Sequence, residues 1–70
     1  MNTQLIEIFH THGTPSKRNH GCLILETNFD IFSMDRDDTI SRLDWVNNGT
    51  QYNEPTDYEL ARIIEEFTAL

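Results

Sequence analysis

Residues 34 to 45, MDRDDTISRLDW, hold three aspartates within four positions: Asp35, Asp37 and Asp38. Carboxylates at this density could coordinate a hard cation such as calcium, which prefers oxygen ligands. A calcium loop of the EF-hand type also needs glycine at its sixth position and glutamate at its twelfth. Counted from Asp35, those positions hold Ile40 and Val46, so the motif fails. Weaker cation binding stays open, but aspartates also favour tight turns by bonding their own backbone, and a turn is our interpretation.

A second set of possible ligands comprises the three histidines and the single cysteine: His10, His12, His20 and Cys22. Imidazole and thiolate are ligands that zinc accepts. Residues i and i+2 of a strand share a face, so HTH and HGC on two paired strands would bring the four together. Against a zinc site, no CxxC or HxxxH spacing is present. The alternative is that the histidines flank a solvated loop and Cys22 packs as a small hydrophobic residue. We predict no cofactor and no metal site, and keep these four as candidate ligands.

Catalytic motifs are the third kind of chemistry to consider. The chain has no G-x-S-x-G, no phosphate loop and no dinucleotide fingerprint. A dyad of Cys22 with His10 can be drawn, but Cys22 begins an apolar run that should bury it, and buried structural cysteines are inert. Carboxylates are plentiful, yet none lies where the sequence predicts an apolar pocket that would raise its pKa. We therefore predict that the protein is not an enzyme.

Charge is the strongest compositional signal. The chain holds 12 Asp and Glu against 5 Lys and Arg, a net charge of −7. Residues 26–70 carry eleven acids and three arginines, whereas residues 1–25 carry a net charge of +1. An acidic surface repels nucleic acid and anionic lipid and attracts basic protein surfaces at long range. We therefore expect a protein partner with a basic surface, no direct nucleic-acid contact and no membrane contact. A purely solubilising role for the charge is the plain alternative.

The length of 70 residues suits one small domain, which we place at residues 1–70. A single cysteine cannot form an intrachain disulfide, and a lone thiol favours a reducing compartment. The first ten residues, MNTQLIEIFH, lack the pattern of a signal peptide. The longest apolar run, CLIL, is far shorter than the roughly 20 residues that span a bilayer. We expect a cytoplasmic protein.

Two segments in the first half of the chain have the composition of strands. Residues 4–12 (QLIEIFHTH) and 20–27 (HGCLILET) are rich in β-forming residues, and a loop of turn residues separates them. Pairing them as a hairpin places Leu5, Phe9, Leu23 and Leu25 on the core face. The opposite face would carry Ile6, Ile8, Ile24 and the His/Cys set. Residues 28–34 continue the second strand or form a short strand of their own.

Residues 39–46 alternate as a strand should and run into a turn signal. Asn48-Gly49 is a favoured type I′ dipeptide, because both central residues of that turn need positive φ. Pairing about this turn sets Trp45 opposite Tyr52, as a cross-strand aromatic pair.

The last segment has the pattern of a helix. Thr56 and Glu59 match a capping box. An apolar stripe with spacing i, i+3, i+4 and i+7 follows, formed by Leu60, Ile63, Ile64 and Phe67. The sequence therefore predicts an α+β fold: a small antiparallel sheet of three to four strands, arranged as a meander of hairpins, with one C-terminal helix packed on one face.

A tiny acidic chain without enzyme motifs is similar in general character to the small accessory proteins that phages and mobile elements encode. We predict a non-catalytic binding protein that inhibits or modulates a larger, nucleic-acid-binding partner by occupying its basic surface, as anti-CRISPR and anti-restriction inhibitors do. Its carboxylates could then imitate the phosphates of DNA, which carry one charge per ~1.7 Å of duplex. That row would comprise Asp30, Asp35, Asp37, Asp38, Asp44, Glu54, Asp57, Glu59, Glu65 and Glu66. As partner-binding residues we single out Asp35, Asp37, Asp38, Asp44, Glu65 and Glu66 for electrostatic steering, with Tyr52 and Tyr58 as anchors.

Two alternatives stay open. One helix cannot cover both faces of a sheet, so a self-associating structural or regulatory module could bury Ile6, Ile8 and Ile24 in a homodimer. A zinc-stabilised module would use the histidines and Cys22.

Overall fold

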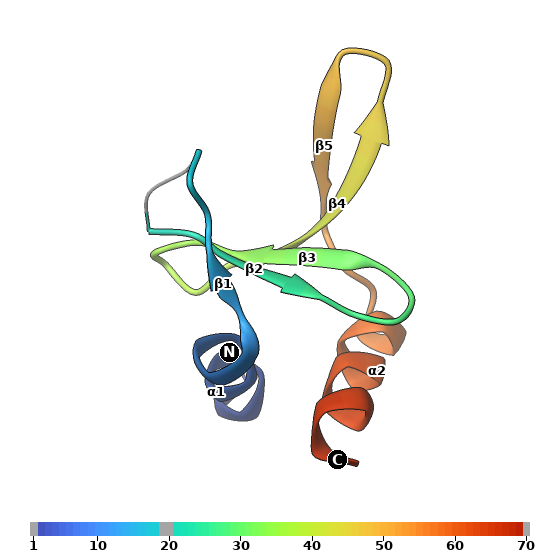
Figure 1. Ribbon diagram of the computed structural model, residues 1–70. Helices are drawn as coiled ribbons and strands as arrows, with labels where there is room; N and C mark the ends of the chain where they lie inside the picture. Colours follow the sequence, from blue (N-terminus) through green and yellow to red (C-terminus); the bar gives the residue numbers. More distant parts are fainter. Residues whose placement is uncertain (1, 19–20, 70) are drawn as a thin grey trace.

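The computed structural model describes residues 2–18 and 21–69. Within these residues the chain forms two helices and five strands: α1 (Thr3–His12), β1 (Thr14–Pro15), β2 (Leu23–Glu26), β3 (Ile31–Met34), β4 (Ile40–Val46), β5 (Gly49–Asn53) and α2 (Asp57–Thr68). The strands make one antiparallel sheet in the order β1-β2-β3-β4-β5 (Figure 1). The α+β class, the meander and the C-terminal helix are confirmed. The sheet has more strands than predicted, and α1 was not predicted.

Helix α1 replaces the strand predicted for residues 4–12, and that prediction is wrong. Asn2 caps the helix, because its Oδ1 accepts a hydrogen bond from the backbone N–H of Gln4 at 2.8 Å. Leu5, Ile8 and Phe9 are buried at i, i+3 and i+4, so a helical face rather than alternate residues meets the core. The predicted hairpin of residues 4–12 with 20–27 therefore does not form. Strand β2 pairs instead with the two-residue β1.

The hydrophobic core lies between both helices and one face of the sheet. Its buried residues are Leu5, Ile8, Phe9, Leu25, Phe32, Met34, Ile40 and Ile63. Figure 1 shows α1 and α2 on the same side of the sheet. The two helices also contact each other, with the rings of His12 and Phe67 4.9 Å apart. The predicted stripe of α2 is confirmed, with Ile63 fully buried and the other three packed against the core.

The other face of the sheet is left uncovered by the two helices. The strand register places Ile24, Ile31, Leu43, Trp45 and Tyr52 on it. An open apolar face was predicted, but its predicted members are mostly wrong. Ile8 is buried and Ile6 packs against the core from α1, because both belong to a helix. Only Ile24 of the predicted self-association set lies on the open face.

Strands β4 and β5 form a hairpin that projects from the body of the molecule (Figure 1). Its two-residue turn is Asn47-Asn48 rather than Asn48-Gly49, since Val46 pairs with Gly49. The turn is not type I′: Asp38 is the only non-glycine residue of the described chain with positive φ, and Gly49 takes a φ of 147° just after the turn. The predicted pairing of Trp45 with Tyr52 is therefore wrong. Trp45 faces Thr50, and Tyr52 faces Leu43.

Candidate binding groove around Tyr52

The aspartate-rich segment MDRDD forms the tight turn between β3 and β4, which confirms its interpretation as a turn. Asp35 Oδ1 accepts hydrogen bonds from the backbone N–H groups of Asp37 at 2.9 Å and Thr39 at 3.0 Å. The N–H of Asp38 donates to the carbonyl of Asp35 at 3.1 Å, and Asp38 adopts the left-handed φ of 64° that aspartate tolerates. Asp37 is exposed and Asp38 half-buried. The turn thus holds three carboxylates close together at one end of the sheet.

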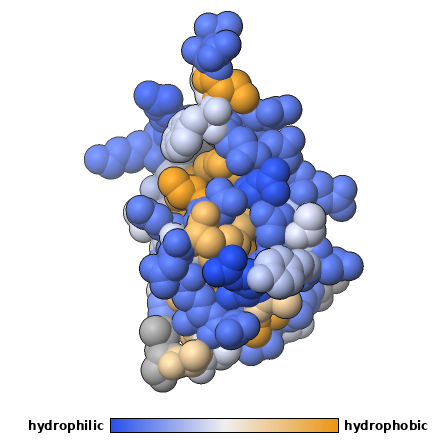
Figure 2. Space-filling model, turned by 90° about the vertical axis from the view of Figure 1, so that its right-hand side faces the viewer, coloured by the Kyte–Doolittle hydropathy of each residue, from blue (hydrophilic) through white to orange (hydrophobic). Residues whose placement is uncertain are grey.

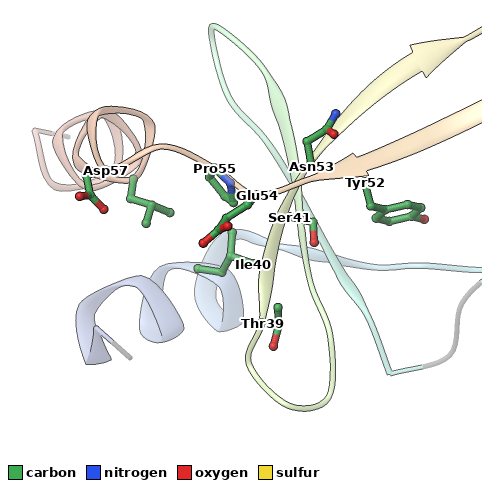
Figure 3. A pocket seen from close by; sticks show the side chains of 9 residues that line it. Thr39, Ile40, Ser41, Tyr52, Asn53, Glu54, Pro55 and Asp57 are labelled. Carbon is green, nitrogen blue, oxygen red and sulfur yellow. The ribbon is translucent and has the colours of Figure 1, made fainter.

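Two hollows lie beside this turn and share Thr39, Ser41 and Tyr52. The larger, of about 460 Å³, is lined by Thr39, Ile40, Ser41, Tyr52, Asn53, Glu54, Pro55, Asp57 and Leu60 (Figure 3). The smaller, of about 230 Å³, is lined by Cys22, Ser33, Asp35, Thr39, Ser41 and Tyr52. Because they share three residues, we treat the two hollows as one surface and call it the Tyr52 groove.

The groove exists because β5 is shorter than β4 at this end. Strand β5 ends at Asn53, which pairs with Arg42, so residues 39–41 have no strand beside them on that side. Pro55 then directs the chain into α2, whose first turns close the far wall. Ile40, Pro55 and Leu60 give the larger hollow an apolar component (Figure 3). The ring of Tyr52 projects from β5 beside the larger hollow, and the residue as a whole is 56% exposed.

The charged residues that line the Tyr52 groove are all acidic. Asp35 lines the smaller hollow, and Glu54 and Asp57 line the larger one. Neither hollow has lysine or arginine among the described residues that line it. Glu54 and Asp57 are exposed, so their charges face solvent at the rim. A hollow with carboxylates, an exposed aromatic ring and an apolar floor offers what a lysine or arginine side chain needs: charge pairing, a π face and cover for its methylenes.

An ion-pair cluster beside the groove joins β4, β5 and α2. The guanidinium of Arg42 lies 3.0 Å from Asp44 Oδ2 and 2.9 Å from Glu59 Oε2. Asn53 Nδ2 also donates to Asp44 Oδ2 at 2.6 Å. Hydrogen bonds to Glu59 and then Asp44 raise the pKa of Arg42. The hydrogen bonds from Arg42 and Asn53 lower the pKa of Asp44.

Glu59 serves this cluster and the helix cap together. Its Oε1 accepts from the backbone N–H of Thr56 at 2.8 Å, and Thr56 Oγ1 accepts from the N–H of Glu59 at 3.1 Å, so the capping box is confirmed. The N–H of Thr56, followed by Arg42, lowers the pKa of Glu59. Asp44 and Glu59 are therefore bound within the molecule, and their charge is partly offset by Arg42.

The remaining predicted partner residues lie on α2, away from the β3–β4 turn in the sequence. Glu66 accepts hydrogen bonds from the backbone N–H of Asn28 at 3.0 and 3.1 Å, so it holds the β2–β3 loop. Glu65 is exposed, and Tyr58 is 71% exposed. Arg62 lies over the ring of Phe29, 4.2 Å from its centroid, and 5.9 Å from that of Tyr58. Tyr58 thus already neighbours a cation of its own chain.

Of the eight predicted partner residues, Asp35 and Tyr52 line the groove, and Asp37 and Asp38 belong to the adjoining turn. Sequence reasoning placed Glu54 and Asp57 in the acidic row but did not single them out. Their position on either side of Pro55, directly after a predicted strand, was the available signal.

Figure 2, which views one side of the molecule, shows hydrophilic residues dominating that face, with separate apolar patches running down from the hairpin tip.

The candidate zinc ligands lose the geometry that suggested them. His10 and His12 lie on α1, where residues two apart do not share a face. His12 packs against Phe67, and Cys22 is half-buried beside the smaller hollow. His20 lies outside the described residues. Among residues 2–18 and 21–69, no group of three or more His, Cys, Asp or Glu could hold a metal ion.

Comparison of the chain with protein-family models, with curated proteins and with solved structures finds no match. In the part of the chain that the structure describes, neither helix has the length and hydropathy needed to cross a membrane.

Proposed function

We propose that this protein is a non-catalytic acidic binding protein, which docks on a basic surface of a larger protein partner through the Tyr52 groove. The observation that carries the proposal is the sign of the charges there: Asp35, Glu54 and Asp57 line the two hollows, and no described cation does. The net charge of −7 supports it, because a field of one sign speeds the approach of a basic partner.

The groove suggests how a basic side chain would be held. A guanidinium or ammonium group above the ring of Tyr52 gains a cation–π contact of about 0.5–1 kcal/mol at an exposed site. Glu54 and Asp57 at the rim supply its counter-charge, while its methylenes lie in the larger hollow, which Tyr52 and Pro55 both line. Asp37 and Asp38, in the neighbouring turn, add long-range attraction rather than contact. Asp44 contributes less, since Arg42 and Asn53 already bind it.

Nucleic-acid-binding proteins are the class of partner that we propose, because they expose basic surfaces built to neutralise phosphates. An inhibitor or modulator of such a protein, of the kind that phages and mobile elements direct against CRISPR or restriction complexes, is one form this activity would take. Support for that form comes from charge and size alone.

The test of the groove uses a fluorescent peptide that contains alternating arginine and glycine, titrated with the protein at low and at high salt. The double variant Glu54→Gln/Asp57→Asn removes two carboxylates with little change in shape. Each exposed ion pair contributes up to about 1 kcal/mol, so we expect about tenfold weaker binding. The matched control, Glu7→Gln/Glu65→Gln, changes the net charge equally on exposed positions outside the groove. Equal weakening in both double variants would show that net charge alone acts and would refute the groove.

Substitutions of Tyr52 test the ring itself. Tyr52→Phe keeps a π face and should bind the peptide as the wild type does, whereas Tyr52→Leu keeps apolar cover over Leu43 but removes the π face, and should bind more weakly. Equal binding by the two variants would exclude a cation–π role.

The class of partner is tested by competition. Tagged protein is used to capture partners from cell lysate at low salt, and duplex DNA is then added to the captured complex. A partner that uses its nucleic-acid site should be released by DNA and, separately, by high salt. A specific partner that DNA fails to displace would contradict a nucleic-acid-binding surface as the target.

A further inference from the structure

The two edges of the sheet are protected to different degrees. Strand β1 is only two residues long, ends in Pro15 and is followed closely by Lys17 and Arg18. Short edge strands, proline and lysine are features by which proteins prevent an edge from pairing with another chain. Strand β5 forms the other edge, has five residues, GTQYN, and carries none of these features. Its outer side pairs with no other strand of the described chain.

The charge pattern indicates what could pair with this edge. Residues 45–53, which include all of β5, contain no charged side chain, although the chain as a whole has a net charge of −7. A basic partner gains no charge pairing from such a strand. A second copy of the chain does gain from it, because like charges directly opposite one another destabilise a strand pair and this edge brings none together. The uncharged edge is therefore electrostatically compatible with itself.

We propose that two copies of this protein pair through β5 in an antiparallel arrangement, with a two-fold axis at Gln51. This register pairs all five residues of the strand: Gln51 faces Gln51 of the second copy, Thr50 faces Tyr52, and Gly49 faces Asn53. The contact is isologous, and it joins two five-stranded sheets into one continuous sheet. The proposal does not rest on binding of a basic partner.

The shape of the hairpin and its exposed side chains support this pairing. The β4–β5 hairpin projects from the body, so a second hairpin can lie beside it (Figure 1). Trp45 is 72% exposed and faces Thr50 across the hairpin. In the dimer this row continues across the new edge into Tyr52 and Leu43 of the second copy, so the exposed aromatic residues of both copies lie on one face. Five paired residues make a small interface, and we expect a dissociation constant in the micromolar range.

Sedimentation equilibrium across a thousandfold range of concentration, from about 1 μM upward, measures the association directly. The wild type should pass from monomer to dimer. Gln51→Lys should remain monomeric, because it sets two lysines against each other at the axis. The hairpin should tolerate this change, since Asp44 lies opposite position 51 within the same chain, and circular dichroism verifies the fold. Ala61→Lys, on an exposed position of α2, is the control with the same charge and should dimerise.

Crosslinking tests the register. In a Cys22→Ser background, Gln51→Cys should form an intermolecular disulfide on mild oxidation, because residues that face each other across an antiparallel pair have Cα atoms about 4.5–5.5 Å apart. Ala61→Cys in the same background is the control and should crosslink far less. A wild type that stays monomeric over the whole range, a Gln51→Lys variant that dimerises normally, or equal crosslinking at both positions would each overturn the proposal.

Discussion

Truncation of Ile8 to alanine distinguishes the helix α1 from a strand in the same segment. In the structure Ile8 is 6% exposed and faces the core, next to Phe9 and one turn from Leu5. The substitution removes three carbons, worth about 0.8 kcal/mol each, and leaves a partly filled cavity. We expect a loss of about 3 kcal/mol. For a disulfide-free chain of this length the total stability is about 3–5 kcal/mol, so most of it would be lost.

The assays are urea denaturation and thermal unfolding, each followed by far-ultraviolet circular dichroism. Fluorescence is less suitable, since Trp45 is too exposed to report unfolding well. The midpoint of thermal unfolding should fall by about 12–24 °C, at 4–8 °C per kcal/mol for a domain of this size. Glu7→Ala, at the neighbouring exposed position, is the control and should change stability by less than about 0.5 kcal/mol. A strand would place Ile8 on the uncovered face, where truncation costs little. A loss below about 1 kcal/mol for Ile8→Ala would therefore refute the packing of α1.

Two further predictions concern the carboxylates. Asp35→Ala should lower stability by about 1 kcal/mol in urea denaturation, because two exposed backbone N–H groups lose their acceptor. Asp35→Asn keeps an acceptor oxygen and should stay close to the wild type; an equal loss in both would show that charge, not the turn, is what matters. The lowered pKa values of Asp44 and Glu59 predict an acid-dependent stability. Their ionised forms are favoured in the folded state, so this contribution is complete above their ordinary pKa values of 3.8 and 4.5 and is lost as pH falls through the lower folded values. Thermal unfolding from pH 7 to about pH 2.5 should show a smaller drop in midpoint for Glu59→Gln, which preserves the capping box, than for the wild type; identical drops would contradict the assignment.

The elements that the sequence predicts well are those whose signals are local. The capping box of Thr56 and Glu59 involves contacts three residues apart, and the stripe of α2 repeats within one helix. The turn at Asp35 is likewise made by a side chain bonding backbone groups two and four residues ahead. Each of these signals lies within a short stretch of the chain, so the residue types alone predict the capping box, the helical stripe and the turn.

Helix α1 had its own local signals, and composition outweighed them. Leu5, Ile8 and Phe9 have helical spacing, and Asn2 is a favourable N-cap residue. The β-branched and aromatic residues of the segment favour a strand by propensity, but tertiary packing overrides propensity in a short amphipathic segment. The error carried over to the zinc hypothesis and to the self-association face, because both were built on the alternation of a strand in residues 4–12.

The Tyr52 groove lay beyond sequence reasoning because it depends on the register of one hairpin. A turn at Asn48-Gly49 would have set Tyr52 beside Trp45. The turn at Asn47-Asn48 sets it beside Leu43 instead, two residues nearer along β4 to residues 39–41, which line the groove. The same shift leaves Trp45 facing the small side chain of Thr50, which helps explain why it is 72% exposed. The displacement of the turn by one residue thus brings Tyr52 toward the part of β4 that lines the groove, while Trp45 stays near the turn of the hairpin.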